Sequence, residues 1–170
     1  MNFGQAAFGL RQVKLTDTAG GAVVYLPAAM MLHFVEKTQS ADFTADGVWV
    51  AARSMPVGVE WELEAGGISL EAYAKMTGRT ATAVGVAPNR TVTLNGDTGT
   101  DFPYFRVYGR AVGDAGTDDV YCVIYRCKLQ EIEGTLRQGE FFVASCAGIA
   151  VRDSTNGLFQ FVQRETGAAI

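Results

Sequence analysis

Apolar and acidic residues alternate over residues 57–67, VGVEWELEAGG. The apolar positions are Val59, Trp61, Leu63 and Ala65, and the acidic positions, called the glutamate row below, are Glu60, Glu62 and Glu64. Successive side chains of a strand point to opposite faces, so this pattern predicts a strand with its apolar face on a core and three carboxylates on the other. Such a row of like charges is explained either by cations that pair with it or by a function of the charged face itself.

The preceding residues, 36–55 (EKTQSADFTADGVWVAARSM), predict a long hairpin. The Asp46-Gly47 pair favours the positive φ of a tight turn at its tip. Phe43 and Trp49 flank that turn without an evident core of their own. Two interpretations stay open: the hairpin protrudes and awaits a partner, or it is an ordinary edge hairpin, since single exposed aromatic residues are common.

Residues 69–77 carry the signals of one short helix. Ser69 suits the N-cap, Ile68 and Tyr73 suit the two positions of a hydrophobic staple, and Gly78 suits a left-handed residue after the last turn. The helix is therefore predicted to end sharply at that glycine.

Most of the remaining chain shows strand patterns separated by turns. Strands are predicted at residues 12–17, 80–86, 90–94, 102–112, 120–132, 141–151 and 158–165, and an irregular apolar segment at 22–35. Many short strands with one helix predict a mainly β fold: a two-sheet β-sandwich or barrel-like subunit with one short flanking α-helix and a long protruding hairpin loop. The length fits a single domain over residues 1–170.

Charge and composition narrow the function. The net charge is −4 and the pI about 5.0, which argues against holding nucleic acid through a basic footprint but not against a protein that nucleic acid passes without binding. No stripe of the sequence combines aromatic and basic residues as single-strand binders do. No segment has the roughly 18 apolar residues of a membrane helix, and the N-terminus lacks a signal-peptide pattern.

Candidate catalytic and metal-binding residues are few. His33 is the sole histidine, so a Ser-His-Asp or Cys-His site would have to use it. Cys122 and Cys127 are five residues apart in one predicted strand, which predicts thiols on opposite faces that do not bridge each other. No metal-ligand spacing or cofactor motif occurs. We therefore expect a non-enzymatic protein with no metal and no cofactor.

Two further interpretations of the glutamate row remain. A glycosidase uses two carboxylates across a cleft, but alternate residues of one strand lie about 6–7 Å apart on one face and do not straddle a sugar. Alternatively, the row pairs with cations on neighbouring strands, with Arg106 and Arg110, or Arg126 and Lys128, as candidates. Such pairs contribute about 0.2–1 kcal/mol each.

The order of these elements points to a known family. The segments that matter are, in chain order, SADFTADGVWVAA, WELEAGGISLEAYAKMTG, DFPYFRVYGRAV, DVYCVIYRCKLQEIEG and GEFFVASCAGIAV. In this order the chain resembles the major tail (tail tube) proteins of long, non-contractile-tailed bacteriophages, over about residues 23–165. None of these segments is a catalytic fingerprint.

The resemblance implies a β-sandwich subunit that forms hexameric rings stacked as a tube. Its long loop would be the 36–55 hairpin, which reaches the neighbouring ring, with Phe43, Asp46, Trp49 and Arg53 as contact candidates. The implied partners are other copies of the chain, a tape-measure protein, tail-end proteins, and double-stranded DNA that passes without specific binding. The implied location is the virion tail, after synthesis in the host bacterial cytoplasm.

In that architecture an inner barrel built from all subunits lines the channel. The hypothesis is that the glutamate row, Glu60, Glu62 and Glu64, faces this lumen, with Arg106 or Arg110 tempering its charge. A channel for a polyanion should repel it weakly and bind it nowhere. Two alternatives stay open: a tube subunit of a contractile tail or secretion apparatus, and a monomeric β-sandwich binding or decoration module.

Overall fold

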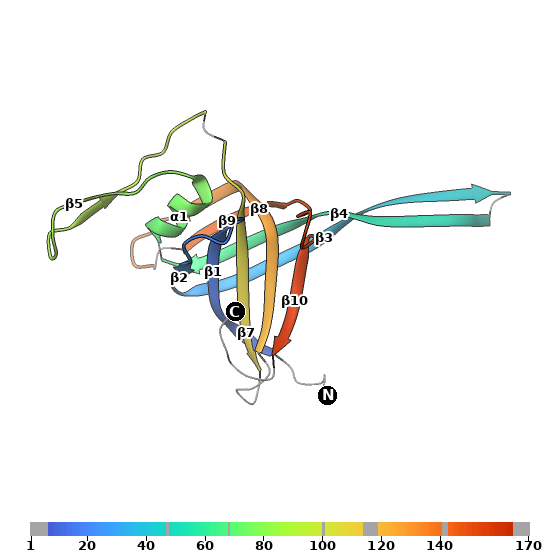
Figure 1. Ribbon diagram of the computed structural model, residues 1–170, viewed down its shortest axis with the longest axis horizontal. Helices are drawn as coiled ribbons and strands as arrows, with labels where there is room; N and C mark the ends of the chain where they lie inside the picture. The colour runs from blue at the N-terminus through green and yellow to red at the C-terminus, as the bar shows by residue number, and fades with distance from the viewer. Residues whose placement is uncertain are drawn as a thin grey trace.

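The computed structural model describes residues 7–46, 48–67, 69–99, 101–113, 119–140 and 143–164. Within these ranges the chain forms ten strands and one helix, which confirms the predicted mainly β, sandwich-like fold with one short helix (Figure 1). In chain order these are β1 (Ala7–Asp17), β2 (Val24–Leu26), β3 (Ala29–Ala45), β4 (Val48–Gly66), α1 (Leu70–Thr77), β5 (Thr82–Val84), β6 (Thr91–Thr93), β7 (Phe105–Gly113), β8 (Asp119–Thr135), β9 (Val143–Ala150) and β10 (Phe159–Arg164).

Strand β8 joins two layers of one folded sheet. Its first half pairs with β7 and β10, and β1 and β2 continue this first layer beyond β7. Its second half pairs with β9, which is followed by β4 and β3 in the second layer. The two sets of strands cross steeply in Figure 1, as in sandwiches whose corner strand passes from one sheet to the other.

A β-bulge makes this corner. Tyr125 and Arg126 of β8 together oppose Arg106 of β7, because the register shifts by one residue there. Arg126 has φ 45°, a left-handed backbone conformation. An extra residue bends a strand and increases its twist, and here it turns β8 from the first layer into the second.

The bulge also changes the direction in which the following side chains point. Cys122 and Cys127 both lie in the same buried core instead of on opposite faces, so that prediction was wrong. The extra residue between them reverses the alternation that the sequence spacing implies. All three cysteines, Cys146 included, are free and buried.

The core fills the space between the layers. Trp61 from the second layer meets Phe105 from the first edge-to-face, with ring centroids 5.6 Å apart and planes at 81°. The other large side chains of this core are Val13, Leu15, Val59, Leu63, Val107, Ile124 and Leu129. Phe34 of β3 packs on Phe159 of β10 with centroids 5.4 Å apart, so the two layers also meet at their far edges.

The helix forms where its caps predict. The side chain of Ser69 accepts a hydrogen bond of 3.2 Å from the backbone N–H of Ala72, and Gly78 ends the helix with φ 70°. The predicted staple residue Ile68 lies outside the described residues. Nothing helical in the described part of the chain is long and apolar enough to cross a membrane.

The second strand of the predicted hairpin and the predicted acidic strand form one continuous strand, β4. β4 runs unbroken through Pro56, between the predicted hairpin and the predicted acidic strand. Lys37 pairs with Gly58 and Thr38 with Pro56, so Val57 is the extra residue of a bulge in β4 itself, and a bulge is a position at which a strand tolerates proline. The segment 22–35, predicted to be irregular, contains β2 and the start of β3, joined by a turn in which Ala28 has φ 51°.

Two arms project from opposite ends of the body (Figure 1). The longer is the outer part of the β3–β4 hairpin, which is exposed throughout residues 37–46 and 48–57. Asp46 at its tip has φ 54°, while Gly47 lies outside the described residues. The shorter arm is the two-stranded β5–β6 ribbon, which pairs with no other strand in the described part of the chain.

Gly148 of β9 offers a test of the packing between β9 and β4. A Cβ there would clash with the carbonyl oxygen of Lys128 and lie 2.7 Å from Cζ2 of Trp61. We expect Gly148→Ala to destabilise the fold by about 1–3 kcal/mol, as overpacking does, and thermal unfolding monitored by circular dichroism measures this. Gly96→Ala is the control, because its Cβ comes no closer than 3.8 Å to Arg79. Equal melting temperatures for both variants would contradict this packing.

Candidate functional site

The outer face of the second layer carries the glutamate row. Trp61 and Leu63 are 2% and 1% exposed in the core, so the glutamates that alternate with them point away from it. Glu60 is exposed, and Glu62 and Glu64 are half-buried between neighbouring strands.

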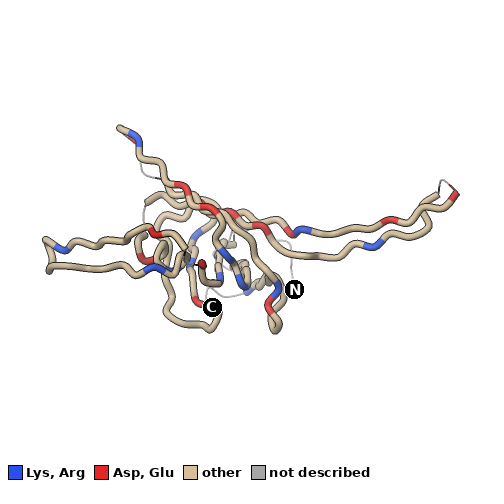
Figure 2. The backbone as a smooth tube through the Cα atoms, turned by 90° about the horizontal axis from the view of Figure 1, so that it is seen from above, with Lys and Arg blue, Asp and Glu red and all other residues tan. Residues whose placement is uncertain are grey.

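Two more glutamates join this face from β8. Glu62 pairs through Ala147 of β9 with Glu131, and Glu64 pairs through Ser145 with Glu133. Ala147 and Ser145 have small side chains, so β9 rises little between the two pairs of carboxylates that flank it. The sequence analysis missed this pair, although Glu131 and Glu133 alternate with Ile132 as the glutamate row alternates with Trp61 and Leu63. Figure 2 shows acidic positions gathered across the strands of the body.

The cations predicted to pair with the row lie elsewhere. Arg106 and Arg110 are on β7 in the first layer, which is not adjacent to β4, so their predicted pairing with the glutamates was wrong. Glu60 instead pairs with Lys37 of β3 at 2.6 Å. No ion pair forms at the other four carboxylates within the described residues, and the resulting acidic face comprises Glu62, Glu64, Glu131 and Glu133.

Lys128 sits at the end of the acidic face and is also occupied. Its Nζ lies 2.7 Å from Asp101, which precedes β7. The hydrogen bond from Lys128 to this carboxylate raises the pKa of the lysine. Both lysines on this side are thus paired with carboxylates and leave the centre of the face negative.

The second layer has two unpaired edges. In the part of the chain that the structure describes, β3 pairs only with β4, and residues 128–135 of β8 pair only with β9. Unpaired edges offer backbone N–H and C=O groups to another strand. The edge at β8 is approached by the loop before β7 through the Asp101–Lys128 ion pair.

The outer face of the first layer carries arginine side chains instead of carboxylates. Arg106 stacks on Tyr125 at 5.5 Å, and Arg110 lies 5.8 Å from the ring of Tyr121. Arg110 Nε also donates a 2.8 Å hydrogen bond to Asp119, which is 1% exposed. The sequence analysis found no aromatic-and-basic stripe because these rings and cations come from different strands and meet only in the sheet.

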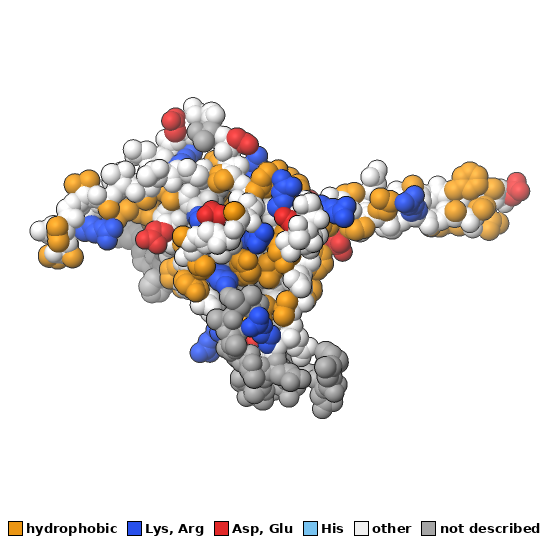
Figure 3. All heavy atoms as spheres, in the orientation of Figure 1, with side chains coloured by type: hydrophobic (Ala, Val, Ile, Leu, Met, Phe, Trp, Pro, Cys, Tyr) orange, Lys and Arg blue, Asp and Glu red, His pale blue; other side chains and the backbone are white. Residues whose placement is uncertain are grey.

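The four hairpin candidates all lie on the β3–β4 arm. Phe43 and Trp49 are 62% and 69% exposed near its tip, and Asp46 and Arg53 are exposed as well. Figure 3 shows hydrophobic side chains gathered at the end of this arm, with an acidic one at its point. A solvent-exposed apolar group so far from the core is typical of an interaction surface.

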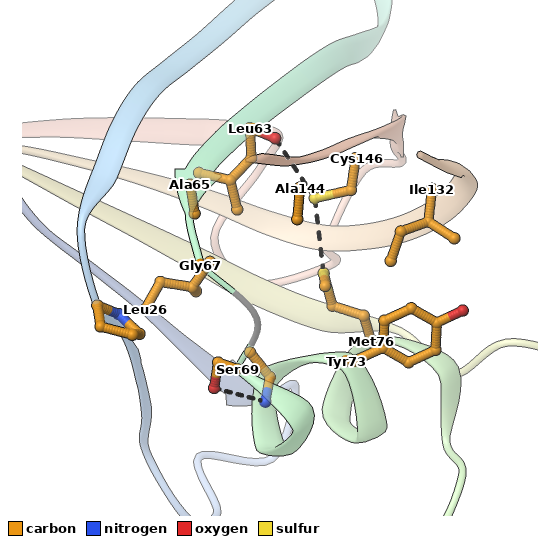
Figure 4. A pocket seen from close by; sticks show the side chains of 12 residues that line it. Leu26, Leu63, Ala65, Gly67, Ser69, Tyr73, Met76, Ile132, Ala144 and Cys146 are labelled. Carbon is orange, nitrogen blue, oxygen red and sulfur yellow. Dashed lines mark hydrogen bonds between the residues drawn. The ribbon is translucent and has the colours of Figure 1, made fainter. Parts of the chain in front are cut away.

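The enclosed pocket beside α1 is a packing gap of about 40 Å³ (Figure 4). Cys146 Sγ fills one side, 3.6 Å from the carbonyl oxygen of Leu63 and 3.9 Å from Met76 Sδ. That volume holds about one water molecule and no substrate.

His33 cannot act with a cysteine in this fold, because it is exposed on β3 whereas the thiols are buried. Within the described residues no group of three His, Cys, Asp or Glu side chains is arranged to hold a metal ion. Among the described residues, the arrangement offers surfaces for association.

Comparisons with known proteins rest on the fold. No protein-family model matches the chain, and no curated protein matches it. It is similar to a chain in the cryo-EM structure of the anti-feeding prophage (AFP) baseplate, 6-fold symmetrised, with TM-score 0.51 and 8% identity over 95% of this chain and 97% of that one. The chain shares its fold with a prophage baseplate chain. At this identity the likeness shows the fold alone.

The thiols give a prediction for native protein. Burial raises the pKa of Cys122 to about 11 and that of Cys146 to about 12, and it also raises the pKa of Cys127. Because the thiolate is the reactive form, we expect no labelling by maleimide at pH 7 in the native state and labelling of all three in denaturant. Mass spectrometry counts the adducts. Rapid labelling of the native protein would contradict the buried positions.

Proposed function

We propose that the chain is a structural subunit of a bacteriophage tail that assembles into hexameric rings, stacked as a tube through which viral DNA leaves the particle. One observation carries the proposal: within the described residues, the second layer combines an outer face with four carboxylates outside any ion pair and an unpaired edge on each side. The protruding β3–β4 arm and the fold likeness to a prophage baseplate chain support it.

The edges support ring closure. Strands β3, β4, β9 and β8 are successively antiparallel, so β3 and β8 run in opposite directions. The β3 edge of one copy therefore fits beside the β8 edge of the next with the antiparallel pairing used inside each subunit. Such a contact joins two different surfaces, and it closes into a ring when the rotation between copies closes.

Charge supports placing the acidic face toward the lumen. Lysine or arginine contacts would hold DNA, since each neutralised phosphate releases counterions and adds affinity. Carboxylates repeated around every ring repel the duplex without holding it, and a narrow pore focuses the field. The cations of the first layer then face outward, where they are already stacked on tyrosine rings or paired with Asp119.

Edge length separates the two layers as candidates for the lumen. The first layer ends in β2 with three residues and β10 with six, whereas residues 128–135 and the body part of β3 offer longer ladders. Longer ladders form more backbone hydrogen bonds with a neighbour. The second layer is thus the better wall for a continuous barrel.

The partners follow from this architecture. Copies of the chain form rings and stacks, a tape-measure protein occupies the lumen during assembly, tail-end proteins cap the tube, and double-stranded DNA passes without specific binding. The virion tail is the proposed location, after synthesis in the cytoplasm of the bacterial host.

A second candidate is a ring of the baseplate end of a tail. The fold likeness favours it, because the similar chain belongs to a baseplate whose structure is 6-fold symmetrised. Negative-stain electron microscopy of concentrated protein distinguishes the tube subunit from the baseplate ring. Stacked tubes favour the tube subunit, single rings favour the baseplate, and a monomer under all conditions, including with tail-end proteins, would overturn both.

Charge reversal tests the lumen assignment. We expect Glu62→Lys with Glu64→Lys to leave tubes assembling but to make them retain short duplex DNA, more strongly at low salt, because cations in the bore bind phosphate. Co-sedimentation of labelled duplex with tubes measures retention. The matched control reverses Glu71 and Glu140, which are exposed and lie off the acidic face. Equal retention by both variants would rule out a lumen lined by the acidic face.

Shortening the hairpin tests stacking. We expect replacement of residues 44–50 by Asn-Gly to leave the fold intact, because Phe43 and Ala51 are paired and a two-residue turn joins them. Without its tip the variant should form rings that do not stack. Electron microscopy and sedimentation measure this, and Trp49→Ala should shorten tubes while Met30→Ala, also exposed, should not. Tubes of normal length from the shortened variant would refute the stacking role.

A further inference from the structure

A groove opens at the root of the β3–β4 arm, where the arm leaves the body. Its apolar walls are Met55 and Val57 of β4 with Leu158 and Phe159 at the start of β10, and its volume is about 580 Å³. Met55 and Val57 are 48% and 56% exposed. Glu36 and Arg152 supply the charged groups that line it. The groove is apolar, open and unexplained by the subunit's own packing.

The β5–β6 ribbon at the opposite end carries a matching projection. Val84 and Val86 are 67% and 82% exposed near its tip, and Arg90 is exposed just before β6. Residues 79–96 contain two arginines and no acidic residue. Figure 3 shows hydrophobic side chains at the end of this ribbon, beside cations. The ribbon thus presents an apolar tip with positive charge.

The directions of the two arms bring this tip and this groove together in a head-to-tail stack. The β3–β4 arm and the β5–β6 ribbon point away from each other (Figure 1). When one copy follows another along this direction, the ribbon of the second points back toward the first and meets the root of its arm. Surfaces at opposite ends of a subunit form a contact that propagates from copy to copy.

We propose that the β5–β6 ribbon is a second stacking element, whose tip docks into the groove at the root of the β3–β4 arm on a copy in the adjacent ring. This rests on the ring-and-tube assembly proposed above. Val84 and Val86 fill the apolar groove, and Arg90 approaches Glu36 at its edge. Each joint between rings then has two contacts, one made by the long arm and one made in return by the ribbon.

A second copy fits this groove by its chemistry. The walls are apolar, which suits valine side chains, and burying such side chains stabilises an interface by roughly 25 cal/mol per Å² of apolar area. Opposite charges at the rim set the register between copies more than they add affinity. The ribbon brings no carboxylate that Glu36 would repel.

Crosslinking of paired cysteines tests the contact. Val86→Cys with Val57→Cys should give, on treating assembled tubes with a short bismaleimide, a ladder of covalent oligomers in denaturing gels. The native thiols are buried and give little background. Each single variant is one control, and Val86→Cys with Leu136→Cys is another, because Leu136 is 80% exposed but lies in the β8–β9 turn, away from the groove.

The outcomes separate the two proposals. A ladder from the Val86/Val57 pair alone supports docking of the ribbon in the groove. If tubes assemble normally and this pair gives no more crosslinking than the controls, the docking is wrong while the tube remains. If the wild-type chain forms no rings or tubes, the tube proposal fails and the docking falls with it.

A charge exchange provides a second readout that needs no cysteine. Arg90→Glu should place like charges at the joint and shorten tubes at low salt, and Glu36→Arg combined with Arg90→Glu should restore their length. Both side chains are exposed, so folding is unaffected. Failure of the double variant to recover, with the single variant impaired, would overturn the pairing.

Discussion

The strict alternation of β4 is the constraint on which the rest depends. Trp61 and Leu63 must point inward for the two layers to pack, and this forces the glutamates between them to the outer face. The cost of gathering carboxylates there is small. Glu62 and Glu64 lie about 6–7 Å apart along β4, and Glu62 and Glu131 are separated by a whole strand, about 10 Å. At these distances two like charges in water repel by roughly 0.6 and 0.4 kcal/mol before salt screening. The fold therefore accommodates this charge pattern at little cost.

The bulge in β8 turns this pattern into a shaped surface. The extra residue at Tyr125–Arg126 bends β8 where it passes from the layer that carries the cations to the layer that carries the carboxylates. The bend separates them into two layers whose outer faces carry opposite charge. The pairing of β8 with β7 continues past the bulge to Cys127 and stops there because β7 begins at Phe105, so residues 128–135 pair only with β9 in the described structure. The bulge thus separates the two differently charged outer faces of the chain.

The sequence predicted what local rules decide. Neighbouring residues alone decide which face of β4 is buried, where the helix is capped (Ser69 and Gly78), and that Asp46 has a positive φ. It did not predict which strands are neighbours, because that depends on the bulge and on tertiary packing. For the same reason it offered Arg106 and Arg110 among the candidate partners of the glutamates, where the structure pairs Arg110 with Asp119. The hairpin predicted over 36–55 and the strand predicted over 57–67 share one strand, in which Pro56 lies at a bulge of β4 itself.

An exposed apolar arm is also a hazard, and its construction limits the partners it accepts. A long two-stranded ribbon offers free backbone groups along both edges, which invites indiscriminate pairing. The β3–β4 arm carries register shifts after Lys37 and after Phe43, and charges at Asp46 and Arg53. Bulges and charges are the devices by which edges avoid unselected partners. These features limit pairing along the arm while Phe43 and Trp49 stay exposed, and in the proposed assembly a copy of the same subunit would cover them.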